Sequence, residues 1–227
     1  MGKLDEARPL LEEALQARRA TLGNRHPSTL VSIGNMAVLL EAMGKLDEAR
    51  PLYEAAVQAS RKTLGDRHPD TLISINNMAT LLEDMGKLEE ARPLYEEALQ
   101  ARKETLGDRH PDTLVSIGNL GNLLEKQGKI AEATPLFTEE LEARVSLHGM
   151  AHKETRDSAR RLAKLLHNAD HQQDEAEALA ARYGVSLQTG DWAQSTLASG
   201  EMYWWRTNEE ESNGIEVTMT EPEEYGV

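Results

Sequence analysis

Apolar residues recur at steps of three and four along two neighbouring stretches of the chain, with Gly44 between them. In an α-helix this spacing places the apolar side chains on one face, so each stretch is predicted to form an amphipathic helix. The apolar positions are Leu30, Ile33, Ala37, Leu40 and Met43 in the first stretch, and Leu46, Ala49, Tyr53, Ala56 and Val57 in the second. The pattern therefore predicts a pair of helices connected at Gly44.

This helical pair is repeated along the chain with a period of 42 residues. The sequence Gly-Lys-Leu-Asp-Glu-Ala-Arg-Pro-Leu begins at Gly2 and again at Gly44, and variants of it begin at Gly86 and Gly128. His-Pro dipeptides keep the same step, at residues 26–27, 68–69 and 110–111. Two markers in register predict a stack of similar helical hairpins in which each repeat packs against its neighbours.

Glycine and proline residues indicate where the helices begin and end. Gly44, Gly86 and Gly128 should each end a first helix, because glycine takes the left-handed conformation that closes a helix without steric cost. The prolines of the His-Pro dipeptides suit a first helical position, where the missing N–H is not needed. Other prolines lie about six residues into each second helix, where proline costs about 3 kcal/mol. We expect a kink or a late helix start at these positions, which are Pro9, Pro51, Pro93 and Pro135.

These signals divide the chain into four parts. Residues 1–25 are predicted to be the second helix of a partial repeat whose first helix is missing, and residues 26–151 to be three full repeats. Residues 152–184 should form a degenerate fourth repeat or cap, with its turn at residues 167–170. Residues 185–227 form an acidic, tryptophan-containing tail without helical periodicity, and we expect it to be either disordered or docked on the repeats.

The residue pattern resembles that of tetratricopeptide repeats, although the usual tetratricopeptide unit has about 34 residues and a period of 42 falls in the range of HEAT and armadillo repeats. The deciding positions are Ala37 and Leu40 before the turn, and Ala49, Tyr53 and Ala56 after it. The resemblance implies an all-α fold, a right-handed superhelical solenoid of helix-turn-helix repeats with a second helix extended by about two turns.

The lengthened unit is similar to the repeats of kinesin light chains. The likeness is carried by Arg-His-Pro-Asp-Thr-Leu and Glu-Ala-Arg-Pro-Leu-Tyr-Glu-Glu-Ala-Leu, and it covers residues 2–150. It implies a noncatalytic module that binds a peptide segment of a partner protein in a concave groove, as the cargo-binding part of a kinesin light chain does. The alternative is a structural subunit or scaffold held through the solenoid faces. A link to a kinesin motor rests on the resemblance alone, since no heptad region precedes Gly2.

Composition narrows the classes of partner and chemistry. A formal charge of −14 disfavours nucleic acid and anionic membranes, whose binding depends on Lys and Arg. No stretch has the roughly 20 apolar residues of a membrane span, and the N-terminus lacks the apolar core of a signal peptide, so we expect a cytoplasmic protein. With no cysteine and no catalytic motif, we expect neither an enzyme nor a cofactor. One metal ion should not gather His26, His68 and His110, which a whole helix pair separates.

Asparagines at equivalent positions of the first helices are the main candidates for ligand binding. In the family such residues line the groove and hold the backbone of a ligand, and an amide side chain can both donate to and accept from an extended peptide. The alternative is that they are solvated helix residues copied by duplication. The candidates are Asn35, Asn77 and Asn119, with Asn76 and Asn122 as unrepeated neighbours.

The charge of the groove predicts the type of ligand. Glu41, Glu83 and Glu125 recur near the predicted groove edge, and the first helices of the first two full repeats carry no Lys or Arg. An acidic groove would suit a basic or neutral peptide better than the tryptophan-acidic cargo peptides of kinesin light chains. Ordinary solvated charge is the alternative for these glutamates.

The fourth hairpin and the tail carry opposite charge. The helix predicted after residue 152 is basic, with Lys153, Arg156, Arg160, Arg161 and Lys164 on it. The tail from residue 191 has nine acidic residues and one Arg, a net charge of −8, and it holds the aromatic residues Trp192, Tyr203, Trp204 and Trp205. Aromatic anchors beside acidic residues suit a binding segment, so the tail is a candidate self-ligand for the basic face. The tryptophans could instead cap the solenoid, or Tyr225-Gly226-Val227 could be a C-terminal ligand.

Overall fold

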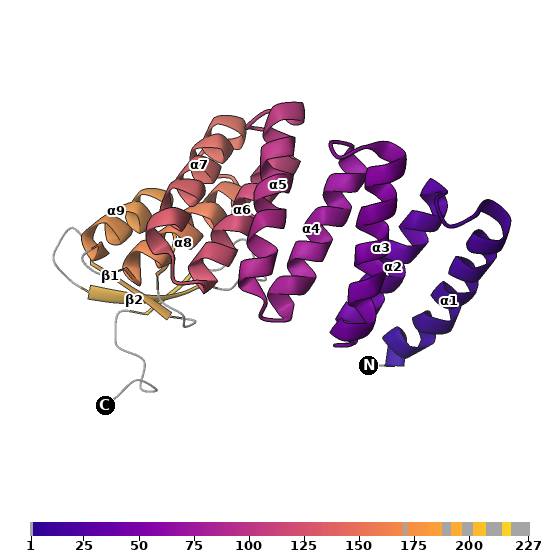
Figure 1. Cartoon of the computed structure of the whole chain (residues 1–227). Helices are drawn as coiled ribbons and strands as arrows, with labels where there is room; N and C mark the ends of the chain where they lie inside the picture. Colours follow the sequence, from indigo (N-terminus) through magenta and orange to yellow (C-terminus); the bar gives the residue numbers. More distant parts are fainter. Residues whose placement is uncertain (1, 170–171, 188–191, 197–201, 208–214, 219–227) are drawn as a thin grey trace. The chain divides into compact units, whose positions relative to one another are not determined.

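The computed structural model describes residues 2–169, 172–187, 192–196, 202–207 and 215–218, and from residue 188 onward it describes backbone only (Figure 1). The described helices are α1 (Gly2–Leu22), α2 (Pro27–Ala42), α3 (Leu46–Leu64), α4 (Pro69–Asp84), α5 (Leu88–Leu106), α6 (Pro111–Lys126), α7 (Ile130–His148), α8 (Lys153–His167) and α9 (Gln173–Tyr183). The predicted all-α solenoid of repeated hairpins is confirmed for residues 2–183, apart from the two undescribed residues 170 and 171.

The chain divides into two units, residues 1–143 and residues 144–227, with the boundary inside α7. In the first unit, each helix from α1 to α5 packs against the next one in the sequence (Figure 1). The first helices of the repeats are α2, α4 and α6, and the second helices are α1, α3, α5 and α7. In the second unit α8 packs against α9.

Each first helix begins with the same cap, formed by the His-Pro dipeptide. The imidazole Nδ1 of His26, His68 and His110 accepts a hydrogen bond from the backbone N–H two residues later, at 3.1–3.2 Å, and proline follows at the first helical position. This bond satisfies one of the N–H groups that an α-helix leaves unpaired at its start. The histidines are therefore helix-entry residues, as expected from their place before proline.

Glycine ends the first helices as predicted. Gly44 has φ +73°, and the Lys45 N–H behind it donates to the Leu40 carbonyl at 2.8 Å, which is the hydrogen bond of a Schellman motif. The expectation of a late second-helix start was wrong, since α3 begins at Leu46 and contains Pro51. A start at Leu46 places the buried Ala49 within the helix, ahead of Pro51. The alternative expectation, a kink at the proline, stays a prediction.

The core lies between first and second helices of the same hairpin and of the next. Leu72 and Ile75 of α4 pack with Ala98 of α5, and all three are at most 1% exposed. One aromatic ring is buried at the same repeat position of α3, α5 and α7: Tyr53, Tyr95 and Phe137. These rings fix the three helices against the first helices of their hairpins, because burying an aromatic side chain removes a large apolar area from water.

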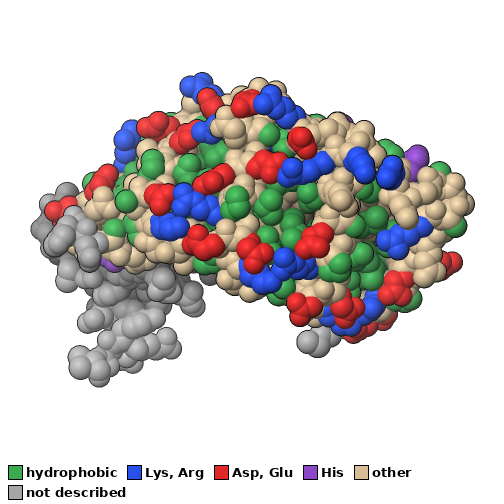
Figure 2. All heavy atoms as spheres, in the orientation of Figure 1, with side chains coloured by type: hydrophobic (Ala, Val, Ile, Leu, Met, Phe, Trp, Pro, Cys, Tyr) green, Lys and Arg blue, Asp and Glu red, His purple; other side chains and the backbone are tan. Residues whose placement is uncertain are grey.

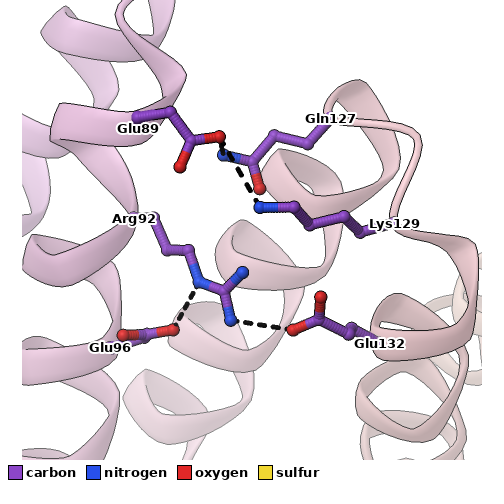
Figure 3. Close-up of polar contacts among 6 residues, drawn as sticks. All are labelled: Glu89, Arg92, Glu96, Gln127, Lys129 and Glu132. Atoms are coloured by element: carbon purple, nitrogen blue, oxygen red, sulfur yellow. Dashed lines mark hydrogen bonds and ion pairs between the residues drawn. The ribbon is translucent and has the colours of Figure 1, made fainter.

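A row of arginines connects successive second helices. Each contacts a glutamate four residues later and another forty residues later, on the next second helix; Figure 3 shows Arg92 between Glu96 and Glu132, at 2.7 and 2.8 Å. The equivalent long-range pairs are Arg8–Glu48 and Arg50–Glu90. Figure 2 accordingly shows acidic and basic side chains interspersed rather than separated by sign. Such surface pairs contribute little individually, but in a row they favour one stagger between repeats.

The tail contains three short strands that the sequence analysis did not predict. They are β1 (Trp192–Thr196), β2 (Met202–Thr207) and β3 (Ile215–Thr218), paired antiparallel in the order β1-β2-β3. Aromatic and β-branched residues favour strands, and the acidic composition of the tail concealed that local preference. These segments lie within the tail that we expected to be either disordered or docked on the repeats, and that expectation stays a prediction.

Gly121 allows the closest approach between the first and second helices of the third repeat. A Cβ added there would lie 2.5 Å from Cε1 of Phe137, whose ring is 1% exposed. Overpacking of this kind costs about 1–3 kcal/mol, which exceeds the roughly 1 kcal/mol that alanine gains over glycine within a helix. We therefore expect Gly121→Ala to lower the midpoint of thermal unfolding by about 2–4 °C, measured by circular dichroism.

Gly34 provides the matched control, because it lies in the interior of α2 and a Cβ there would meet no atom within 4 Å. Gly34→Ala should raise the midpoint, since only the gain of about 0.5–1 kcal/mol in helix propensity remains. Equal shifts in the two variants would contradict the tight contact at Gly121.

Candidate functional site

The side of the first helices that faces away from the core forms one continuous candidate binding surface, which we call the first-helix face. Its positions repeat every 42 residues and lie on successive turns of each helix, at spacings of four and three. They are Val31, Asn35 and Val38 on α2, Ile73, Asn77 and Thr80 on α4, and Val115, Asn119 and Asn122 on α6. All the repeated groove candidates of the sequence analysis therefore lie on this face.

The first-helix face carries an exposed apolar residue in every full repeat. Val31, Ile73 and Val115 occupy the same repeat position, and their exposed fractions are 55%, 48% and 48%. Val38 is 48% exposed one further turn along α2. Single exposed apolar residues are ordinary, but a row of β-branched side chains kept in register gives a ligand apolar contacts at regular intervals.

Neighbouring first helices contact each other through residues 43 positions apart, and between α4 and α6 two such pairs are bonded. The Asn119 amide Nδ2 donates to Oδ1 of Asn76 at 3.0 Å. The Lys126 ammonium Nζ contacts Oε1 of Glu83 at 2.5 Å, and the Glu83 side chain is 10% exposed. We call this arrangement the second step. Its asparagines bond to each other, which leaves them fewer free groups for a ligand than the sequence suggested.

The equivalent pairs between α2 and α4, which we call the first step, are Gly34 with Asn77 and Glu41 with Asp84. Gly34 has no side chain, so it offers the Asn77 amide nothing to bond. Asp84 replaces the lysine of the second step, and its negative charge acts on Glu41 instead of neutralising it. Within the described part of the chain, no ion pair joins a cation to either carboxylate.

Buried tyrosines hold the glutamates at the edge of this face. The Tyr53 hydroxyl donates to Oε2 of Glu41 at 2.6 Å, and the Tyr95 hydroxyl donates to Oε2 of Glu83 at 3.0 Å. Burial, followed by the hydrogen bond to Glu41, raises the pKa of Tyr53 above its ordinary value, so the phenol stays protonated and donating. These glutamates are not freely solvated, which was the alternative offered for them.

The pKa of Glu41 reflects its surroundings in the first step. Burial raises this pKa, the hydrogen bond from Tyr53 lowers it, and the charge of Asp84 raises it again, with a net upward shift. In the second step, the hydrogen bond to Glu83 raises the pKa of Lys126 despite partial burial. The two steps therefore differ electrostatically although their backbones are equivalent.

The basic residues of the fourth hairpin lie on α8, but the structure engages some of them internally. The Arg156 guanidinium donates to the Gly184 carbonyl at 2.7 Å, and Arg160 pairs with Asp157 at 2.8 Å. Lys153 is exposed, whereas Arg161 and Lys164 are half-buried. The predicted basic face thus serves partly to hold the end of α9, whose last carbonyls attract positive charge.

The aromatic candidates of the tail lie in the small sheet. Trp192 pairs with Arg206 across β1 and β2, and Tyr203, Trp204 and Trp205 are consecutive residues of β2. Their side chains, and the C-terminal residues 225–227, lie outside the described part of the structure. Docking of the tail on the basic face therefore stays a prediction.

Neither a metal site nor a membrane span emerges from the described residues. No three His, Cys, Asp or Glu side chains among them come together as metal ligands would. None of the described helices has both the length and the apolar character required to cross a bilayer.

Comparisons with known proteins bear on this geometry. A family model described as tetratricopeptide repeat matches residues 1–62, 31–104 and 73–144, which together span more than half of the chain. The chain belongs to the tetratricopeptide repeat family. It is thus a protein-interaction repeat module, and the first-helix face is formed by the first helices of its tetratricopeptide repeats.

Solved structures indicate the type of repeat. Two crystal structures of a Podospora anserina protein, described as a kinesin light chain with nearly identical tetratricopeptide-like repeats, are 30% identical to this chain, with a TM-score of 0.73. The match covers 81% of this chain and 86% of that one. The tetratricopeptide repeats are therefore of the kinesin light chain type, as the residue pattern indicated.

A more distant structural neighbour, BtubC (BKLC) from P. vanneervenii, is 22% identical with a TM-score of 0.67, and the match covers 86% of this chain and 80% of that one. That likeness concerns the fold alone. The comparison with curated protein sequences finds no match.

The first step gives a testable dependence of stability on pH. Because the pKa of Glu41 is raised on folding, the native state binds more protons than the unfolded chain as Glu41 titrates, so stability falls as pH rises through that range. Replacing Glu41 with Gln removes this loss and still lets Tyr53 donate. We expect Glu41→Gln to raise the free energy of unfolding by about 0.5 kcal/mol at pH 7, as for other like-charge pairs. The gain should vanish near pH 4 in urea titrations.

Glu83→Gln is the opposing control, because Glu83 is paired with Lys126 rather than with a second carboxylate. It should lower the free energy of unfolding at pH 7. If both substitutions changed stability in the same direction, the contrast between the two steps would be wrong.

Proposed function

We propose that this protein is a noncatalytic binding module that holds an extended segment of a partner protein along its first-helix face. The coarser assignment, a protein-interaction repeat module, follows from its family. The single observation that carries the finer proposal is the register of exposed apolar and amide side chains on α2, α4 and α6, repeated every 42 residues. We take this face as the counterpart of the groove that the resemblance to kinesin light chains implies.

The spacing of the face suits an extended peptide. First helices that contact each other through side chains have axes on the order of 10 Å apart, and an extended peptide advances about 3.3 Å per residue. Each repeat therefore meets roughly every third residue of a bound segment. The β-branched side chains supply apolar contacts, and the amides can pair with the peptide N–H and C=O whatever the peptide's sequence.

The candidate asparagines differ in how readily their side-chain amides could bond to a ligand. Asn77 is half-buried and bonds to no other side chain in the described part of the chain, whereas Asn119 donates to Asn76. Asn35 is exposed on α2 and Asn122 is half-buried on α6. Asn77 therefore offers a ligand more than Asn119 does, because no internal hydrogen bond has to be broken to use it.

The proposal is tested with a display library of random dodecapeptides selected against the immobilised full chain. Enriched peptides would be synthesised, labelled and titrated by fluorescence anisotropy. Asn77→Ala should weaken binding about tenfold, since two hydrogen bonds of about 0.7 kcal/mol each would be lost.

The control is Asn24→Ala, which makes the same chemical change in the exposed connection before α2 and should leave affinity unchanged. Failure of any peptide to enrich, or equal affinity of the Asn77 and Asn24 variants, would reject the first-helix face as the binding site. The scaffold alternative, with partners on other solenoid faces, would then be favoured.

A further inference from the structure

The two steps of the first-helix face have equivalent backbones but different side chains, so a comparison of the two shows which interactions each one lacks. In the second step, Lys126 lies against Glu83, and Asn119 bonds to Asn76. In the first step, Asp84 occupies the repeat position of Lys126, and Gly34 occupies the repeat position of Asn76. The second step is therefore satisfied internally, while the first step lacks a cation and a partner for one amide.

The first step has open space beside Asn77 and negative charge at Glu41 and Asp84. A Cβ at Gly34 would meet no atom within 4 Å, so the space beside Asn77 is open. Glu41 is held in place by the Tyr53 hydroxyl at 2.6 Å, and the charge of Asp84 acts on it across the step. Lys126 is bonded to Glu83 and also lies within electrostatic range of Asp84. Glu41 and Asp84 themselves form no ion pair in the described part of the chain.

We propose that the first step binds a basic extended peptide segment, with a Lys or Arg side chain seated between Glu41 and Asp84 and a neighbouring backbone amide bonded to Asn77. This inference rests on the proposed function and adds the chemical class of the ligand. The ligand's cation would take the role that Lys126 has in the second step. Flanking apolar residues of the segment would pack on Val31 and Ile73, which are 55% and 48% exposed.

Charge complementarity favours a basic occupant over an acidic one. A peptide carboxylate placed here would face the like charges of Glu41 and Asp84, which form no ion pair in the described part of the chain, and partial burial increases that cost. A peptide ammonium or guanidinium would form charge-assisted hydrogen bonds, which are about twice as strong as neutral ones. It would also relieve the repulsion between Glu41 and Asp84, so binding would remove the destabilisation that this pair causes in the unliganded protein.

The test uses the enriched peptides together with full-length variants in which a residue of one step is replaced by its counterpart in the other step. Asp84→Lys supplies the cation internally, as Lys126 does, and should fold normally because the next repeat already has this arrangement. In the original protein, replacing the peptide's critical Lys with Gln should weaken binding about tenfold, whereas in Asp84→Lys the same replacement should change affinity less than twofold. Asp84→Asn, which changes charge with little change in shape, should reduce the Lys preference as well.

The reciprocal variant is Lys126→Asp, which gives the second step a carboxylate pair of its own. It should select a second basic residue about three positions from the first, following the spacing between repeats. Raising the salt to about 1 M, where the Debye length is near 3 Å, should weaken Lys-containing peptides more than their Gln counterparts.

Two outcomes would overturn the inference in distinguishable ways. Peptides that enrich without Lys or Arg, or a Lys preference that survives Asp84→Lys and Asp84→Asn, would reject the basic ligand but leave the proposed function standing. A library from which nothing enriches would reject both. Thermal unfolding of each variant would show whether lost binding reflects lost folding.

Discussion

The first-helix face depends on one geometric constraint, the contact between residues 43 positions apart on neighbouring first helices. The repeat advances by 42 residues, so each contact joins a repeat position to the one following it on the next helix. The flank of one helix therefore always meets a different flank of the next. Equivalent residues therefore need not pair with each other. The interaction formed at each step depends on two side chains that come from different positions of the repeat.

This register is maintained by the second helices on the opposite side. Each arginine of the outer row contacts a glutamate forty residues later, and the buried rings of Tyr53, Tyr95 and Phe137 fix α3, α5 and α7 against the first helices of their hairpins. A nearly constant backbone results, in which first-helix side chains can change without altering the stack. Burial supplies the stability, and the surface pairs select one stagger among several.

The helical hairpins could be predicted from sequence because their signals are local. Glycines with positive φ and His-Pro caps mark the ends of helices directly, and apolar spacing marks their faces. The helix start before Pro51 could not be predicted, because proline is unfavourable inside a helix and the sequence does not show what offsets that cost. The bond between Asn76 and Asn119 was not predicted, because comparing residues 42 positions apart does not show which residues 43 positions apart are in contact. The opposite charges of Glu83 and Lys126, which are 43 positions apart, were the available signal for this contact.

Departures from the repeat carry more information than the repeat itself. A residue copied in every unit can be explained by duplication and packing, as the histidine caps and buried alanines are. A substitution that leaves one step satisfied and its neighbour unsatisfied has no such explanation, because the satisfied version is already present in the same chain. Asp84 is a residue of this type, and its charge beside Glu41 lowers the stability that its step would otherwise have. Proteins that give up stability at particular surface positions often do so where they bind, and this is why the first step, rather than the whole groove, is the place where recognition should be concentrated.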